Sequence, residues 1–148
     1  MEKGKLTAIW IKRMKRGPMD EVDRADLVVG SGINGNMNQG GRRQVTILEK
    51  EQWDALMNQF GSALSPSMRR ANLLVTGVNL VETHGRTLKI GSCRILINGE
   101  TKPCEMIEEL LPGLKDAMYP EWRGGAFGEV LNNGTISVGD EVEWISTE

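Results

Sequence analysis

The sequence is poor in the residues that form covalent cross-links and metal sites. It has two cysteines, Cys93 and Cys104, and one histidine, His84. These are too few for a structural zinc site of the usual cysteine-rich type. In a reducing compartment both cysteines are expected to be free thiols rather than partners in a disulfide.

The chain also lacks long apolar runs and a strong charge of either sign. No apolar run is long enough to cross a bilayer, and a short apolar piece followed by basic residues at the N-terminus reverses the order of a secretory signal. The formal net charge of −2 gives no general attraction to nucleic acid or to an anionic membrane. We therefore expect a cytoplasmic protein that binds neither, and no feature of the sequence indicates an oligomeric state.

What the chain does contain is the pattern of a small domain rich in strands. Apolar and β-branched segments predict short strands at 5–12, 43–48, 71–80, 85–99 and 134–144, and 18 glycines are spread along the chain. Residues 16–23, with Gly17-Pro18, predict a loop. We expect one domain with seven or eight strands in a barrel or sandwich, together with two or three short helices.

Two segments predict helices. Residues 49–61 carry one apolar stripe at helical spacing and end at Gly61, the expected C-cap. The stripe is formed by Trp53, Leu56, Met57 and Phe60. The second helix is expected to begin at Pro103, because proline suits a first helical position, and to stop before Pro112-Gly113.

Cys104 is the strongest candidate for chemistry. In the first turn of a helix opened by Pro103, free N–H groups and the helix dipole would favour a thiolate. Lys102 would add to this effect and Glu105 would oppose it. A thiolate can attack, carry sulfur or bind a soft metal. The alternative is that Cys104 is a small buried hydrophobic residue.

Three loops place arginine beside glycine or asparagine. A guanidinium fork next to accessible backbone N–H groups suits phosphate or carboxylate, although each arginine pair alone is more often part of a solvated surface. The three loops together favour an anionic ligand. They contain Arg42 and Arg43 after Gly40-Gly41, Arg69 and Arg70 before Asn72, and Arg123 before Gly124 and Gly125.

These segments, in this order, resemble the MOSC domain, named for the C-terminal domain of molybdenum cofactor sulfurase. The resemblance runs through "LTAIWI", "GINGN", "RRQVTIL", "RRANLLVTGVNL", "LKIGSCRILINGETKPCE" and "WRGGAFGEVLNNGTISVGDEV". Its most specific element is the cysteine of "KPCE" followed by "RGG". It implies a mainly β, MOSC-type barrel with two or three short helices, in a small stand-alone, bacterial-type protein whose single domain spans residues 1–148.

The resemblance also implies a role for Cys104. That residue would carry sulfur as a persulfide, or lie beside the metal of a bound molybdenum cofactor (molybdopterin) as a molybdenum ligand. The expected cofactor-binding residues are Arg43, Arg70, Asn72, Lys102, Arg123, Gly124 and Gly125. In large family members a pyridoxal-phosphate desulfurase domain supplies the sulfur. Here pyridoxal phosphate is therefore expected only on a separate cysteine desulfurase partner.

Two other functions remain open at this point. Some relatives reduce N-hydroxylated bases with a bound molybdenum cofactor and an electron-transfer partner, so an enzyme here would be a sulfur transferase or a molybdenum-dependent oxidoreductase. The third possibility is a non-catalytic module that binds some other anion. Many family members have a glycine-aspartate-basic-histidine run where this chain has Gly35-Asn36-Met37-Asn38. The missing acid and histidine weaken the reductase interpretation.

Overall fold

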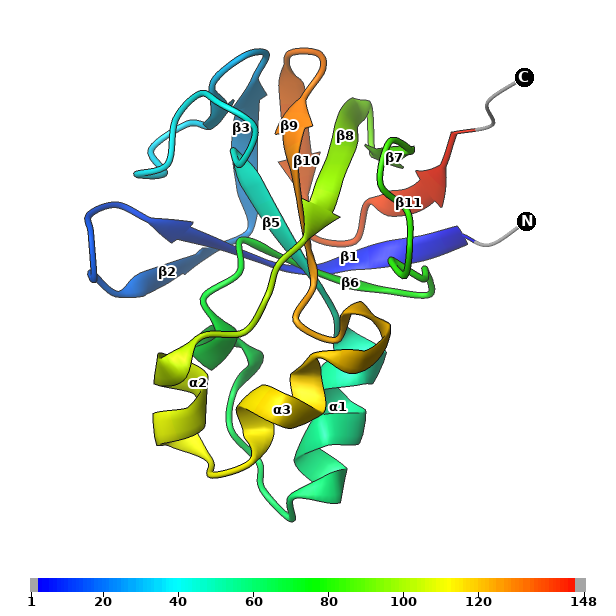
Figure 1. Cartoon of the computed structure of the whole chain (residues 1–148). Helices are drawn as coiled ribbons and strands as arrows, with labels where there is room; N and C mark the ends of the chain where they lie inside the picture. Colours follow the sequence, from blue (N-terminus) through cyan, green and yellow to red (C-terminus); the bar gives the residue numbers. More distant parts are fainter. Residues whose placement is uncertain (1–2, 146–148) are drawn as a thin grey trace.

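The structure, a computed structural model that describes residues 3–145, is a small β-barrel with helices packed on one side (Figure 1). The strands are β1 (Lys3–Lys12), β2 (Met19–Val22), β3 (Arg24–Val28), β4 (Gly32–Ile33), β5 (Val45–Glu49), β6 (Leu73–Thr76), β7 (Thr87–Ile90), β8 (Cys93–Glu100), β9 (Ala126–Val130), β10 (Gly134–Ser137) and β11 (Glu141–Trp144). The helices are α1 (Lys50–Gln59), α2 (Glu105–Leu110) and α3 (Leu114–Met118), with 3₁₀ turns η1 (Pro66–Arg69) and η2 (Pro120–Trp122).

Strand pairing closes the main sheet on itself. The strands are hydrogen-bonded in the order β11-β7-β8-β9-β5-β6-β1-β2, and β11 also pairs with β1. Seven strands therefore form a closed barrel, while β2 extends from the far end of β1. Only the β5–β6 pair of this sheet is parallel among the described residues. The predicted β-barrel with a few short helices is confirmed.

The β7–β8 hairpin illustrates how the sequence pattern builds the barrel wall. The segment 85–99, predicted to form strand, is divided by a turn at Gly91-Ser92, where Gly91 has a φ of +56°. A positive φ is readily available only to glycine. Four alternating apolar side chains on the two sides of this turn are fully buried in the barrel core, namely Leu88, Ile90, Ile95 and Ile97.

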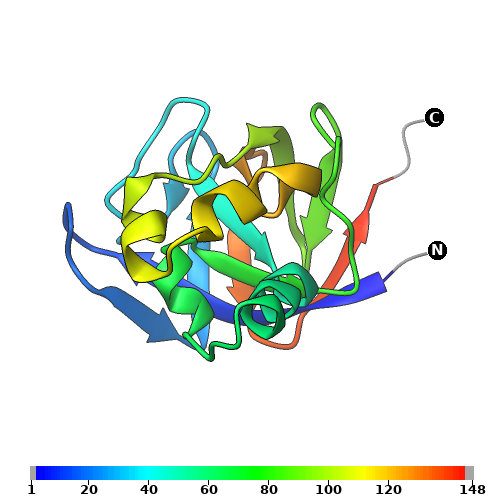
Figure 2. The same cartoon turned by 60° about the horizontal axis from the view of Figure 1, so that its bottom comes forward.

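A second apolar core lies outside the barrel, beneath the three helices. Trp53 and Leu56 of α1 pack with Ile107 of α2 and with Leu114 and Met118 of α3. The same cluster includes Leu48 of β5 and Leu74 of β6, so the helices pack against the outer face of these strands. Figures 1 and 2 show the helices gathered at one end of the molecule. This arrangement brings α2 close to the end of β1.

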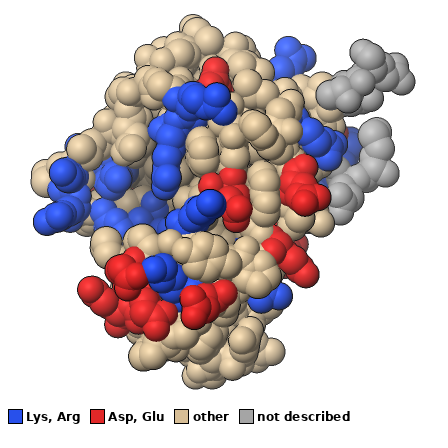
Figure 3. Space-filling model, in the orientation of Figure 1, with Lys and Arg blue, Asp and Glu red and all other residues tan. Residues whose placement is uncertain are grey.

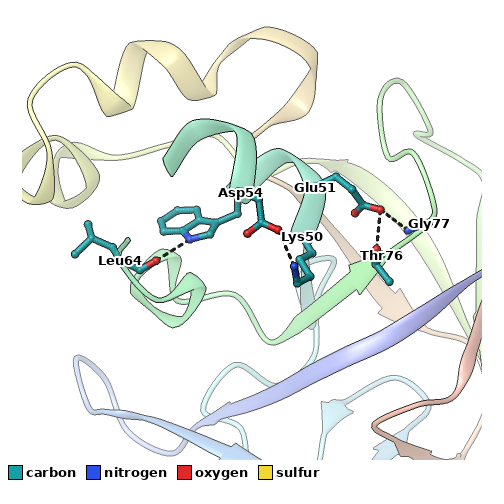
Figure 4. A network of polar contacts seen from close by, with 7 residues as sticks. Lys50, Glu51, Asp54, Leu64, Thr76 and Gly77 are labelled. Atoms are coloured by element: carbon teal, nitrogen blue, oxygen red, sulfur yellow. Dashed lines mark hydrogen bonds and ion pairs between the residues drawn. The ribbon is translucent and has the colours of Figure 1, made fainter. Parts of the chain in front are cut away.

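Helix α1 is fixed to the barrel by polar contacts at its first turn (Figure 4). The Glu51 carboxylate accepts hydrogen bonds from the Thr76 hydroxyl at 2.6 Å and from the Gly77 amide at 2.7 Å. Two residues further on, the Trp53 indole donates to the Leu64 carbonyl at 3.0 Å. The carboxylate thus joins α1 to the end of β6, and the indole joins it to the segment that leads into η1.

One loop prediction is wrong. Residues 16–23 were expected to form a loop, but Met19–Val22 form β2, which pairs antiparallel with residues 9–12 of β1. The reason is the length of β1, which continues past the barrel and offers an unpaired edge that a neighbouring segment can use. The resulting β1–β2 hairpin projects from the barrel toward the left of Figure 1.

Within residues 3–145, no helix has both the length and the apolar character needed to span a bilayer.

Gly125 provides a test of how closely the strands approach each other. Its φ is +101°, and a Cβ built there would lie 2.2 Å from the Ile47 carbonyl oxygen. We expect Gly125→Ala to lower the free energy of unfolding by about 3–5 kcal/mol, because backbone must move as well as adopt a strained conformation. Urea denaturation measures this loss.

Gly85 is the matched control. Its φ is +86° and no atom lies within 4 Å of a Cβ built there, so Gly85→Ala should cost only the backbone strain of about 1–2 kcal/mol. Equal losses in the two variants would contradict the close approach at Gly125.

Candidate functional site

A groove with a cationic lining lies where β1, η1 and α2 meet. Its volume is about 430 Å³, and Lys12, Arg43, Arg69 and Arg70 line it together with Cys104. Figure 3 shows basic side chains gathered over the β1–β2 hairpin and the loop that leads into β5, above acidic side chains that cover α2. The groove follows the boundary between these two charged surfaces.

Cys104 stands at the edge of this groove as the N-cap of α2. It is a free, exposed thiol, and its backbone is extended, with φ −122° and ψ 175°. Its carbonyl accepts from the Ile107 amide at 3.0 Å, and its side chain makes no capping hydrogen bond. Its exposure argues against the alternative of a small buried hydrophobic residue.

The prediction that α2 begins at Pro103 is wrong, because the helix begins at Glu105. A helix starting at Pro103 would need the Lys102 carbonyl for its first internal hydrogen bond. That carbonyl instead accepts from the Arg69 guanidinium at 3.4 Å. The chain therefore stays extended for two more residues and places Cys104 before the first turn rather than in it.

Arg69 is the buried cation that holds this segment. Its Nε donates to the Gly124 carbonyl and its Nη2 to the Thr101 carbonyl, both at 3.1 Å. Burial lowers the pKa of Arg69 to about 10, and interaction with Cys104 acts in the opposite direction. Arg69 is thus still cationic at neutral pH, close enough to Cys104 for the two groups to interact electrostatically.

A smaller, more enclosed cavity adjoins the groove, and we call it the inner cavity. Its volume is about 60 Å³, and Lys12, Arg43 and Arg70 line both spaces. The rest of its wall is polar and comes from Asn36, Asn38, Gln44, Thr46 and Asn72. The same three cations therefore connect the inner cavity to the groove that holds Cys104.

The three shared cations are placed by contacts that leave their charge uncompensated. Arg70 has a left-handed backbone with φ +64° and donates to the Gly17 carbonyl at 2.6 Å, while the Arg43 guanidinium lies 5.6 Å from the centroid of the Phe127 ring. Burial, then the charges of Arg70 and Arg43, lower the pKa of Lys12. Among residues 3–145 none of the three forms an ion pair with a carboxylate. Like charges held together in this way favour an anion between them.

One family model matches most of the chain. The model of the MOSC domain matches residues 34–143. The chain belongs to the MOSC domain family. The match includes Cys104, Arg43, Arg70 and Asn72, whereas Lys12 lies before it.

Solved structures share the fold of this MOSC domain. The YuaD protein from Bacillus subtilis superposes with a TM-score of 0.81 over 100% of both chains, at 23% identity. YiiM from Geobacillus stearothermophilus gives a TM-score of 0.73 at 14% identity, covering 97% of this chain and 75% of that one. YiiM from Escherichia coli gives 0.72 at 17% identity, covering 97% and 71%. A search of curated proteins gave no match.

The structure brings together only some of the predicted site residues. Arg43, Arg70 and Cys104, which the sequence analysis singled out separately, line the same groove. Asn72 lines the inner cavity, where its Oδ1 accepts from Thr46 and its Nδ2 donates to the Trp10 carbonyl. The buried side chain of Asn72 thus links β5 to β1 by hydrogen bonds, and it also forms part of the cavity wall.

The other predicted residues lie outside the lining of both spaces. Lys102 contributes its carbonyl to Arg69, while its side chain is exposed. Arg123 turns toward the Ala117 carbonyl at 3.3 Å. Gly124 and Gly125 allow close backbone contacts, since a Cβ on either would lie 2.2 Å from a carbonyl oxygen. The contacts of these glycines are packing contacts within the barrel.

Sequence reasoning missed Lys12 and the amide of Asn36. Lys12 is the last residue of β1, whose apolar pattern indicates only which face packs in the core. A lysine at the end of a strand was the one sequence feature that could have indicated a site there. Asn36 was noted as the replacement of an acid in the family pattern. Its position in the cavity wall depends on a long-range contact with Lys12 of β1, which local sequence does not reveal.

Arg69 can be tested by replacement with lysine, which keeps the charge but cannot reach three carbonyls with a planar fork. We expect Arg69→Lys to lower the free energy of unfolding by about 2–4 kcal/mol, because buried carbonyls lose donors. Hydrogen exchange at residues 101–105 should also become faster. Urea denaturation and exchange mass spectrometry measure the two effects.

Arg13→Lys is the control for this variant. Arg13 forms an exposed ion pair with Asp20 at 2.9 Å, and such pairs contribute about 1 kcal/mol or less. If Arg69→Lys costs no more than this control, Arg69 does not hold the segment before Cys104.

Proposed function

We propose that this MOSC domain acts in molybdenum cofactor and sulfur metabolism. Its groove would bind a molybdopterin-type cofactor, and Cys104 would carry sulfur as a persulfide or contact the metal of that cofactor. The observation that supports this most directly is the exposed thiol of Cys104 at the edge of a groove lined by four cations. A soft nucleophile beside a site for an anion is what both roles require.

The residues present fit such a cofactor. Molybdopterin is a polar pterin that carries a phosphate, and a groove of about 430 Å³ falls in the size range of small-molecule sites. Lys12, Arg43 and Arg70 could neutralise the phosphate, since none of them is paired with a carboxylate in the described part of the chain. Met68 and Met106 add exposed apolar surface for a flat ring.

The chain's own residues have separate tasks in this proposal. The three shared cations would orient the anionic end of the cofactor, and Arg69 positions the segment that carries Cys104. The bound cofactor would supply a redox-active metal centre. Among residues 3–145 no group of three or more His, Cys, Asp or Glu side chains could hold a metal ion. Cys104 is thus proposed as a ligand to metal held by the cofactor.

Sulfur would reach Cys104 from a partner. We propose a separate cysteine desulfurase that holds the pyridoxal phosphate, in a cytoplasm that keeps Cys93 and Cys104 reduced. The reductase alternative, with an electron-transfer partner, would have to work without the acid and the histidine that Asn36 and Asn38 replace. The alternative of a generic anion-binding module predicts that binding does not depend on Cys104.

The test is to purify the wild type and Cys104→Ser, without reductant, from cells that make molybdenum cofactor. We expect pterin and molybdenum in stoichiometric amounts on the wild type and a large loss of both on the variant, because the soft ligand is gone. Fluorescence of the oxidised pterin and elemental analysis measure the two components. Retention of cofactor by Cys104→Ser would support the generic module instead.

Arg43→Ala and Arg42→Ala form a matched pair for the cationic lining. Arg43 lines the groove, whereas its exposed neighbour Arg42 lines neither the groove nor the inner cavity. Losing one charge-assisted contact should weaken cofactor binding roughly tenfold in Arg43→Ala and leave it unchanged in Arg42→Ala. Equal losses would show that only the general positive field matters.

A further inference from the structure

The amide of Asn36 is nearly fully buried and has an unused donor. Asn36 is 5% exposed and lines the inner cavity. Its Oδ1 accepts from the Lys12 amide at 2.9 Å and from Asn72 Nδ2 at 3.1 Å. These two donors fix the orientation, since a flipped amide would set its NH₂ against both of them. The NH₂ is therefore the end left for the cavity, and it has no acceptor among the described residues.

The inner cavity thus offers donors and no acceptor of comparable strength. Lys12, Arg43 and Arg70 contribute positive charge and Asn36 contributes an amide N–H, while no carboxylate is part of the lining. Its volume of about 60 Å³ equals that of roughly two water molecules, which is close to the size of one tetrahedral oxyanion. Asn36 Nδ2 is not among the fully buried side-chain atoms that lack a partner, so it is accessible and can donate to a ligand oxygen in the cavity. The cavity therefore suits a single sulfonate- or phosphate-like group.

The inner cavity shares Lys12, Arg43 and Arg70 with the groove that Cys104 lines, and this arrangement suits an anion that carries a transferable sulfur atom. We propose that this protein takes sulfur from thiosulfate, with the sulfonate end of the anion in the inner cavity and the terminal sulfur facing Cys104 across the shared cations. The inference rests on the proposed role of Cys104 as a sulfur carrier and names its donor. Thiosulfate is the smallest anion that joins a tetrahedral oxyanion group to a transferable sulfur atom.

The transfer needs no oxidant or reductant. The Cys104 thiolate attacks the terminal sulfur of thiosulfate, and a new S–S bond forms to Cys104 Sγ. The S–S bond within thiosulfate breaks, and its electron pair leaves with the sulfonate group as sulfite. Cysteine thiolate and thiosulfate thus become cysteine persulfide and sulfite, with the total charge unchanged. The cations of the inner cavity hold sulfite as it leaves and so stabilise the developing charge.

The experiment incubates the reduced protein, freed of reductant, with increasing thiosulfate and follows intact mass and released sulfite. The wild type should gain one sulfur atom and release an equal amount of sulfite, whereas Cys104→Ser should do neither. Inorganic phosphate and sulfite should compete with thiosulfate. Inhibition by phosphate would show that the cavity recognises the oxyanion group itself, and sulfur transfer from thiosulfate would identify the sulfur-bearing source.

Asn36→Asp tests the cavity with an isosteric change. It keeps the acceptor for Lys12 and Asn72 but turns the free donor into a second carboxylate oxygen, so the half-saturating thiosulfate concentration should rise roughly tenfold or more. Asn34→Asp is the control, because Asn34 is exposed and outside the cavity lining. Arg43→Gln should act in the same direction as Asn36→Asp, which guards against a folding defect in one variant.

The outcomes separate this inference from the proposed function. If Cys104 accepts sulfur from a cysteine desulfurase and cysteine but not from thiosulfate, the inference is overturned and the sulfur-carrier role stands. If both donors fail, both are overturned. If thiosulfate loads Cys104 equally well in the wild type, Asn36→Asp and Arg43→Gln, the assignment to the inner cavity is wrong.

Discussion

The guanidinium of Arg69 extends the pairing of β8 and β9 beyond its last residue pair, and the site depends on this extension. The ladder ends at Glu100 opposite Ala126, and the Thr101 amide still donates to the Gly125 carbonyl at 2.8 Å. Past that point the strands separate and leave carbonyls without partners. Arg69 donates to three of them, from Thr101, Lys102 and Gly124. These bonds hold residues 101 and 102 in the extended path that precedes α2.

The cations of the groove fall into two kinds: Arg69, which holds the backbone in place, and Lys12, Arg43 and Arg70, which are available to bind a ligand. Arg69 donates hydrogen bonds to three backbone carbonyls. It therefore contributes a fixed positive charge to the groove but no guanidinium edge that is free to bind a ligand. Lys12, Arg43 and Arg70 have at most one such contact each, to a carbonyl or a ring face. They therefore have donors left for a ligand. The groove thus combines one buried cation, which fixes the backbone before Cys104, with three partly exposed cations that can bind a ligand.

The sequence predicted the fold well because its signals are local. The stripe of residues 49–61 is a helix and the alternation of 85–99 is a hairpin, and both patterns can be recognised without knowing the partner. The segment 19–22 could not be predicted as a strand, because its pairing depends on how far β1 extends past the barrel. Likewise, the start of α2 is set by Arg69, which is distant in sequence from the residues it holds.

The candidate site residues were proposed from equally local patterns. Arg43 follows two glycines, Arg70 precedes Asn72, and Cys104 follows a proline. Arg123, before two glycines, fits the arginine pattern equally well, yet its guanidinium reaches a carbonyl in α3. The difference arises from where each loop leaves the barrel, which only the topology decides.

Asn36 shows how one atom can set the chemistry of a cavity that the rest of the fold builds. The contact to the Lys12 amide needs an acceptor oxygen, and aspartate or asparagine would supply it equally well. The second atom of the side chain belongs to a residue that lines the same cavity as the three cations. An aspartate oxygen there would neutralise part of their charge and accept their hydrogen bonds, whereas an amide adds a donor. In this chain the cavity therefore combines three cations and an amide donor, with no carboxylate in its lining.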